Sequence, residues 1–432
     1  MARRLVLLAM IACSSATSGS LTLVTGGESD VFSRAPTPTQ LVVEAEATDG
    51  TFRTITQVPL PASSVDLGDQ NQSDVVSLRV SGRDSQGARL VYGASLFLSL
   101  GALQNTSFPI FVQRTGEWAR MPGALADARE APVVAIVNRR VLLIAGGVGA
   151  DTAPRAGAYD LATLASLGAT PTLPRAPRSM VLANGVAVLI DDQGADTYSF
   201  TDGRVAPLAA PAGESFADVS GGSTFVTETG AAYLVGATRT SGAPTSSVFF
   251  VDTSGNSKML KLVAPRLGAA AAYVPGRGLL VFGGSAVAAG AELIAPGTNL
   301  SVALAFAPDA TTGAGAAQLA GASVLIAGGV DAQGAPAAVR AIDLACATAC
   351  VASPWAPVGV GLSPSQVVGF DAATALLVGE DAAGQTRTFR LEKGASAEVT
   401  PRLARQRARA LVSPSGAVLL VGGAGVVESF YP

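Results

Sequence analysis

The sequence predicts an all-β protein built mainly as a β-propeller, a ring of repeated sheets, on three observations. Short runs rich in Val, Leu and Ile recur seven times at a spacing of roughly 45 residues, which is the period of a repeat protein. Each run has only about four to six residues, which suits a strand buried on both faces better than a helix. All but one of the runs end in glycine. A ring covers both faces of each sheet and leaves only short edges exposed.

The glycines that end these runs fall into two groups. Four runs end in a Gly-Gly pair, at Gly146 and Gly147, Gly283 and Gly284, Gly328 and Gly329, and Gly422 and Gly423. Two weaker copies end in a single glycine, Gly236 or Gly379, and a seventh copy at residues 188–191 has lost its glycines. We assign these glycines a structural role in the repeat, because glycine permits positive φ and close approach of two backbones.

This pattern resembles the kelch repeat, in which an apolar strand ends in Gly-Gly, the next strand carries an aromatic residue and Asp, and another carries Trp. The second of these elements is visible at residues 156–161 (AGAYDL) and 248–252 (VFFVD), and the Trp occurs at Trp118 and Trp355. The resemblance covers about residues 114–432. It implies a kelch-like propeller of seven blades, with six as the alternative, and it supports a fold and not a particular function.

The repeat count leaves the last blade one strand short. The seventh unit stops at Pro432 before any fourth strand, whereas residues 111–121 carry Trp118 with no preceding Gly-Gly. We therefore expect residues 111–121 to close the ring as the outer strand of the last blade, so that the propeller spans residues 111–432.

The N-terminus has the features of an export signal. Two arginines precede an apolar run, and the predicted signal peptide covers residues 1–12. Residues 10–13 (MIAC) resemble the bacterial lipobox, which implies lipidation of Cys13 and, because Ser14 follows, an outer-membrane anchor facing either side of that membrane. An ordinary cleaved signal with an incidental cysteine is the alternative. Residues 13–38 are rich in Ser, Thr, Gly and Pro and predict a flexible tether, with an isolated strand near residues 21–24.

Residues 39–110 predict a separate small domain. They contain five or six candidate strands, such as the alternating LVVEAEA of residues 41–47, and show no helical periodicity. We expect a small β-sandwich of immunoglobulin-like type, although the Cys and Trp spacing of true immunoglobulin domains is absent. Its expected role is to act as a spacer or to pack on the propeller, with a binding role as the alternative.

Composition excludes several classes of function. The chain of 432 residues has no histidine, which removes Ser-His-Asp catalysis and histidine-based metal sites. Its net charge of −3 gives no basic field for nucleic acid. We expect no metal and no cofactor, and contact with a membrane only through the N-terminal lipid. We also expect a monomer.

Two cysteines remain besides Cys13. Cys346 and Cys350 lie in ACATAC, and in an exported protein we expect them to form a disulfide. A metal-binding pair is the alternative, but two sulfurs without histidine make poor zinc coordination.

Two groups of arginines are candidates for a site. Arg129, Glu130, Arg178 and Arg266 precede blade strands, where they either face a central pocket or tie blades together through backbone carbonyls. Residues 402–409 hold the densest basic cluster, which indicates either an anion or glycan site near the axis or a solvated connection into the last blade.

Together these features predict a cell-envelope lipoprotein that binds or scaffolds a protein or glycan through its propeller. The alternative is a histidine-free carbohydrate-active enzyme, of sugar isomerase or glycosidase type, that uses arginines and carboxylates of the axial pocket. Convergent carboxylates in that pocket favour the enzyme, whereas a mouth lined by Ala, Gly and Ser favours binding. A propeller that has lost any ligand is a third reading.

Overall fold

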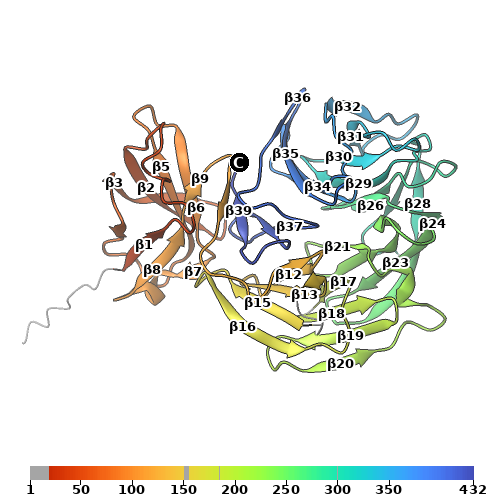
Figure 1. Ribbon diagram of the computed structural model, residues 1–432, viewed down its shortest axis with the longest axis horizontal. Coiled ribbons are helices and arrows are strands. Elements are labelled where there is room, and N and C mark those ends of the chain that lie inside the picture. The colour runs from red at the N-terminus through yellow and green to blue at the C-terminus, as the bar shows by residue number, and fades with distance from the viewer. Residues whose placement is uncertain (1–18, 150–154, 184, 299) are drawn as a thin grey trace, which may run out of the picture. The chain divides into compact units, whose positions relative to one another are not determined.

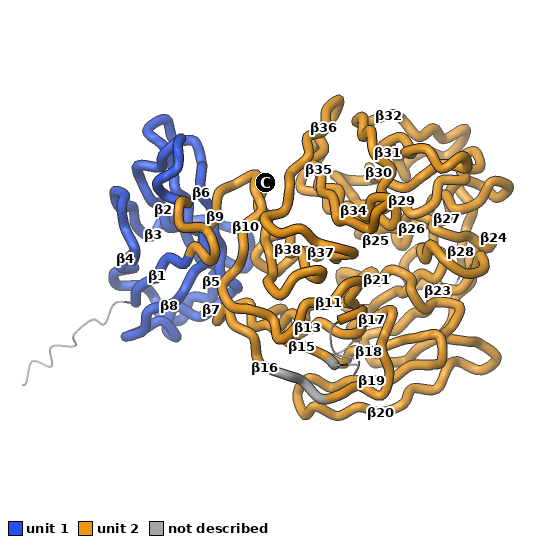
Figure 2. The backbone as a smooth tube through the Cα atoms, viewed as in Figure 1, with its two compact units in different colours: residues 1–24, 32–112 blue, residues 25–31, 113–432 orange. Residues whose placement is uncertain are grey.

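The computed structural model describes residues 19–149, 155–183, 185–298 and 300–432. The regular secondary structure of these residues is β-strand apart from three short 3-10 helices, η1 (Leu100–Leu103), η2 (Phe216–Asp218) and η3 (Gly236–Thr238). The chain divides into two compact units, shown in Figure 2. The N-terminal unit comprises residues up to 24 and residues 32–112, and the propeller unit comprises residues 25–31 and 113–432. The predicted signal peptide and Cys13 lie outside the described residues.

No helix in the described part of the chain is both long enough and apolar enough to cross a bilayer.

The N-terminal unit contains two sheets. One has the strand order β3-β2-β5-β6, with β7 beside β5, and the other has the order β4-β1-β8. Buried side chains on both sheets, including Leu41, Leu78 and Leu21, have no exposed surface. The strands are β1 (Ser20–Val24), β2 (Gln40–Ala47), β3 (Phe52–Pro59), β4 (Ser64–Asp66), β5 (Val75–Arg83), β6 (Arg89–Ala94), β7 (Leu98–Ser99) and β8 (Ser107–Phe111).

Strand β1 corrects the expectation of an isolated strand within a tether. It pairs in parallel with β8 and antiparallel with β4, so its backbone is hydrogen-bonded on both sides. Leu21 is fully buried in this position. The residues that follow, Thr25–Val31, belong to the propeller unit. There Glu28 accepts hydrogen bonds from the backbone N–H and the guanidinium of Arg120, at 3.0 and 2.9 Å.

The propeller unit contains seven four-stranded antiparallel sheets among its described residues. The first three are β12 (Val133–Val137), β13 (Val141–Ala145), β15 (Arg155–Asp160) and β16 (Ala165–Thr172); β17 (Ser179–Ala183), β18 (Val186–Asp191), β19 (Gly194–Ser199) and β20 (Val205–Leu208); and β21 (Ser223–Val226), β22 (Ala232–Val235), β23 (Thr245–Val251) and β24 (Ser257–Arg266).

The next three sheets have the same order from the first strand to the fourth. They are β25 (Ala270–Val274), β26 (Gly278–Phe282), β27 (Ala291–Ile294) and β28 (Ser301–Leu304); β29 (Thr312–Gln318), β30 (Ser323–Val330), β31 (Val339–Asp343) and β32 (Ser353–Ala356); and β33 (Ser365–Gly369), β34 (Thr374–Glu380), β35 (Thr386–Glu392) and β36 (Ala395–Glu398).

The last sheet joins the two ends of the propeller unit. Its first three strands are β37 (Arg409–Val412), β38 (Val418–Val421) and β39 (Glu428–Phe430), and its fourth is β10 (Trp118–Arg120). Trp118 lies opposite Phe430 in this antiparallel pair. Shorter strands also occur, β9 (Gln113–Arg114) and the pair β11 (Arg129–Glu130) with β14 (Val148–Gly149).

The first strands of the seven sheets lie side by side in a closed ring, visible in Figure 1. Each packs on the first strand of the next sheet, and β37 of the last sheet packs on β12 of the first. A closed ring of antiparallel four-stranded sheets is a β-propeller. The fold is therefore all-β, and residues from the two ends of the propeller unit hydrogen-bond to each other within one sheet.

The apolar runs found in the sequence are the second strands of these sheets. Every residue of β13, β26 and β38 is buried. Their side chains fill the spaces between neighbouring sheets. Leu325 of β30 and Leu377 of β34, for example, share one core cluster and have no exposed surface. The central residues of these strands form continuous apolar runs and do not alternate, because each strand is covered on both faces.

The glycines at the strand ends meet two different demands. Gly422 and Gly423 have φ values of 101° and 69°, and a Cβ on Gly423 would lie 2.5 Å from the backbone nitrogen of Gln406. The single Gly236 does not have positive φ, but a Cβ there would lie 2.2 Å from the carbonyl oxygen of Asp218. Glycine is thus required by left-handed backbone and close packing together at the first site, and by close packing alone at the second.

Candidate axial binding cavity

A cavity of about 820 Å³ lies where the first strands of all seven sheets come together. In antiparallel sheets the start of each first strand and the end of each second strand lie at the same end of the ring. Most lining residues come from these positions, and most are small. Those from the first strands include Val133, Ser179, Ser223, Ala271, Gly315, Ser365 and Ala410.

Four arginines line this cavity, Arg178, Arg239, Arg407 and Arg409. Among the described lining residues there is no Asp, Glu or Lys, and Phe225 is the sole aromatic side chain. The described lining therefore shows no carboxylate cluster of the kind that the carbohydrate-enzyme hypothesis requires. It combines small side chains with positive charge.

Two of the arginines are neutralised by carboxylates that lie outside the lining. Arg178 contacts Asp192 at 2.5 Å, and both side chains are about half exposed. Arg409 contacts Glu380 at 2.8 Å, in a more buried position. An exposed pair such as Arg178 with Asp192 contributes little to stability, with a median of about 0–1 kcal/mol.

The other two arginines have no ion-pair partner among the described residues. Arg239 is half-buried and donates to the backbone carbonyls of Ala217 and Ala243, at 2.7 and 2.6 Å. Arg407 is exposed, and its main chain has a φ of 50°. Its carbonyl accepts a hydrogen bond from the N–H of Ala131. The described residues at this end of the cavity therefore carry more positive than negative charge.

The remaining predicted candidates do not line the cavity. Arg266 has no exposed surface and donates to the carbonyl of Gly283 at 2.7 Å and to Glu292 at 2.8 Å. Arg129 is nearly as buried and donates to the carbonyl of Gly146 at 3.1 Å. Glu130 lies on β11, which pairs with β14. The two guanidinium groups are held by backbone and carboxylate partners. Arg178 is thus the one member of this group in the lining, whereas the basic cluster of residues 402–409 contributes Arg407 and Arg409.

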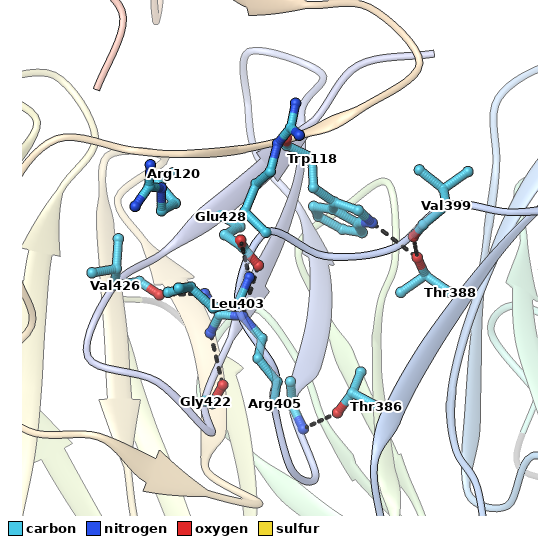
Figure 3. A network of polar contacts seen from close by, with 12 residues as sticks. Trp118, Arg120, Thr386, Thr388, Val399, Leu403, Arg405, Gly422, Val426 and Glu428 are labelled. Atoms are coloured by element: carbon cyan, nitrogen blue, oxygen red, sulfur yellow. Dashed lines mark hydrogen bonds and ion pairs between the residues drawn. The ribbon is translucent and has the colours of Figure 1, made fainter. Parts of the chain in front are cut away.

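Three buried arginines, Arg129, Arg266 and Arg405, share one geometry, which Figure 3 shows for Arg405. Arg405 donates to the carbonyl of Gly422 at 2.7 Å, to Glu428 at 2.8 Å and to the carbonyl of Val426 at 2.6 Å. Arg129 and Arg266 reach the glycine that begins a Gly-Gly pair at the same separation of 17 residues. Burial lowers the pKa of the Arg405 guanidinium, and Glu428 opposes this effect.

Both tryptophans are buried in fourth strands of sheets. The indole nitrogen of Trp118 on β10 donates to the hydroxyl of Thr388 on β35, in the neighbouring sheet, at 2.9 Å (Figure 3). Trp355 on β32 packs in the core cluster between its sheet and the next. Cys346 and Cys350 form a disulfide with a Cα–Cα distance of 5.7 Å.

Arg239 is the cavity residue that the sequence reading misses. It follows Gly236 by three residues, at the end of a second strand, and so reaches the same end of the ring as the first-strand residue Arg178. That position in the repeat is the signal that could have found it. In the residues that the structure describes, no group of three or more His, Cys, Asp or Glu side chains is placed to hold a metal ion.

Comparisons with known proteins give structural likeness alone. No protein-family model matches the sequence, and no curated protein matches it. Among solved structures, one described as "YCF48 bound to D1 peptide" has a TM-score of 0.48 and 11% identity over 73% of this chain and 95% of its own. Another, "Crystal Structure of Mitotic Checkpoint Complex", has a TM-score of 0.47 and 11% identity over 74% of this chain and 92% of its own. At these values the likeness carries no argument about function.

Proposed function

We propose that the propeller is a binding or scaffolding module that engages a protein partner at the arginine-bearing mouth of its axial cavity. The observation that carries this proposal is the lining, to which all seven sheets contribute small side chains. Its described residues include four arginines and no carboxylate. Binding sites on folds of repeated sheets commonly use loops and the concave surfaces that a rigid scaffold positions. The proposal needs no cofactor and no metal.

We propose further that the repeats are kelch-like and form seven blades. The Gly-Gly pairs at the ends of four second strands support this, since all eight glycines have positive φ. The positions of Trp118 and Trp355 in fourth strands also support it. The N-terminal unit is proposed to be an immunoglobulin-like sandwich that spaces the propeller from its anchor, and its two sheets are consistent with that role.

The proposed location is the cell envelope, by a lipid on Cys13 and an outer-membrane anchor. The support is the signal-like sequence of residues 1–13 together with the disulfide between Cys346 and Cys350, because structural disulfides persist mainly in oxidising compartments. Mass spectrometry of the full chain made in a bacterial host tests this location. We expect an acylated Cys13 as the first residue, and an unmodified residue 13 would contradict the lipoprotein proposal.

The binding proposal is tested by blocking the mouth of the cavity. Ser241 is an exposed lining residue, so S241W places a large ring at the mouth. Ser254 is exposed on the turn between β23 and β24, outside the lining, so S254W is the matched control. The full chain and both variants are used to capture proteins from envelope extracts. We expect partners retained by the parent chain and by S254W to be lost from S241W, whereas equal capture by all three would contradict the proposal.

A further inference from the structure

We infer that the mouth of the axial cavity recognises carboxylate groups of an acidic segment in the partner protein. This inference rests on the proposed function, and it specifies the chemistry of the partner at that same site. It follows from where the arginines lie, how their charges are balanced, and what else lines the cavity.

Three of the lining arginines lie at the same end of the ring. Arg178 comes directly before β17, Arg407 lies two residues before the start of β37, and Arg239 follows the end of β22. These positions are at the same end of the ring, because first strands begin where second strands end. All three residues line one cavity. A ligand at this end can therefore meet cations from three different sheets.

The arginines that line the cavity outnumber the carboxylates that pair with them. Four lining arginines are set against two carboxylates, Asp192 and Glu380, of which Asp192 is also within Coulombic range of Arg239. Among the described residues the site therefore holds two positive charges in excess, although the whole chain has a net charge of −3. A local excess of this kind attracts anions to the mouth and does not arise from general basicity.

Arg407 has an unusual backbone conformation for an arginine. Its φ of 50° lies in the left-handed region, which residues other than glycine adopt infrequently. Its guanidinium makes no hydrogen bond or ion pair with any described residue, and it is exposed at the cavity. Glycine would suit this backbone better, so arginine here contributes its charge and not the stability of the turn.

The lining favours one class of anion over the others that arginine can bind. Guanidinium groups bind carboxylates and phosphates through paired hydrogen bonds. With Phe225 as the one aromatic side chain in the described lining, the cavity offers little surface on which bases could stack. Most of the other lining residues are small, such as Gly222 and Ser223, which leaves room for a narrow ligand such as an extended peptide. Acidic side chains on a peptide fit this combination of features.

The experiment measures binding of a fluorescent hexaglutamate peptide to the full chain by anisotropy, with hexaglutamine as the neutral peptide. The test variant is R239Q/R407Q. The control is R204Q/K393Q, which removes the same charge from two exposed positions outside the cavity lining. We expect hexaglutamate alone to bind, with affinity reduced about tenfold or more in the test variant and nearly unchanged in the control. Binding should also weaken as salt is raised.

A second variant separates binding from folding. R407G removes the charge and relieves the left-handed backbone, so we expect weaker peptide binding with an unchanged or higher unfolding midpoint. Equal binding of hexaglutamate by R407G, R239Q/R407Q and the parent chain would overturn the inference, and so would equal binding of hexaglutamine. Displacement of the peptide by inorganic phosphate at about 1 mM would reassign the site to phosphate. If S241W abolishes partner capture while R239Q/R407Q leaves it intact, the inference fails and the proposed function stands.

Discussion

Arg405 and Glu428 form an ion pair in which neither side chain has any exposed surface, with 2.8 Å between Nε and the carboxylate oxygen. Arg266 and Glu292 repeat this arrangement three sheets earlier, at 0% and 1% exposure. In both sheets the arginine also donates to the carbonyl of the glycine that begins the Gly-Gly pair. The pair therefore ties the approach to a first strand to the end of the second strand and to the third strand.

Breaking this pair should be costly. E428Q leaves the Arg405 cation buried without a counter-ion, and we expect the free energy of unfolding to fall by about 3–5 kcal/mol. Urea denaturation measures the change. The matched control is E398Q, which removes the exposed pair between Arg387 and Glu398 and should cost below about 1 kcal/mol. Similar losses in the two variants would show that burial does not govern the contribution of these pairs.

The hydrogen bond between Trp118 and Thr388 joins the last two sheets of the ring. T388V keeps the shape of the side chain but leaves the buried indole N–H without its acceptor and also removes the hydroxyl that donates to the carbonyl of Val399. We expect a loss of about 1–3 kcal/mol in unfolding free energy. T197V removes a less buried hydroxyl and serves as the comparison, with a smaller expected loss. An undiminished stability in T388V would contradict a structural role for this contact.

Asp309 should contribute to the acid sensitivity of the fold. Burial acts to raise its pKa, but hydrogen bonds from Thr311 and Arg340 outweigh this, and the pKa is held below its usual 3.8. A carboxylate whose pKa is lower in the folded state stabilises the fold above the unfolded pKa, and that contribution is lost as pH falls through the folded value. D309N should therefore lower stability at neutral pH and flatten the decline in stability below about pH 4. Denaturation midpoints across that range measure both effects, and an unaltered acid slope in D309N would count against this assignment.

The disulfide closes a very short loop. In the chain-entropy treatment, closing a loop of this length contributes about 2 kcal/mol. We expect C346S/C350S to lose roughly that amount of unfolding free energy while partner capture is kept, because neither residue lines the cavity. Thiol labelling of the unreduced parent chain provides the control and should find neither Cys346 nor Cys350 reactive. Labelling of both would contradict the bond.

The sequence predicts the repeated sheets because their signal is local. A second strand such as β38 is apolar along its whole length and ends at Gly422, so its two covered faces and its exit are both readable without a partner. Strand β1 is different, because its alternation shows that one face is buried but does not identify β8 as its neighbour. That parallel pairing joins residues more than 80 positions apart, such as Leu21 and Phe108.

The arginines illustrate the same limit in the site. Arg266 and Arg178 look alike in the sequence, since both precede a first strand. Their environments differ because Arg266 finds Glu292, 26 residues later, and is fully buried, whereas Arg178 meets Asp192 in a half-exposed position. The position of a residue in the repeat predicts which end of the ring it reaches. Which groups neutralise it depends on long-range contacts that spacing does not encode.

The most direct test of the binding account is site-specific photocrosslinking in cells. A photoreactive amino acid is placed at Thr240, an exposed residue of the cavity lining, or at Val302, which is 61% exposed on the outer strand β28. The account predicts a protein adduct from position 240, loss of that adduct in the R239Q/R407Q background, and no equivalent adduct from position 302. An adduct from position 302 with none from position 240 would contradict the assignment of function to the axial cavity.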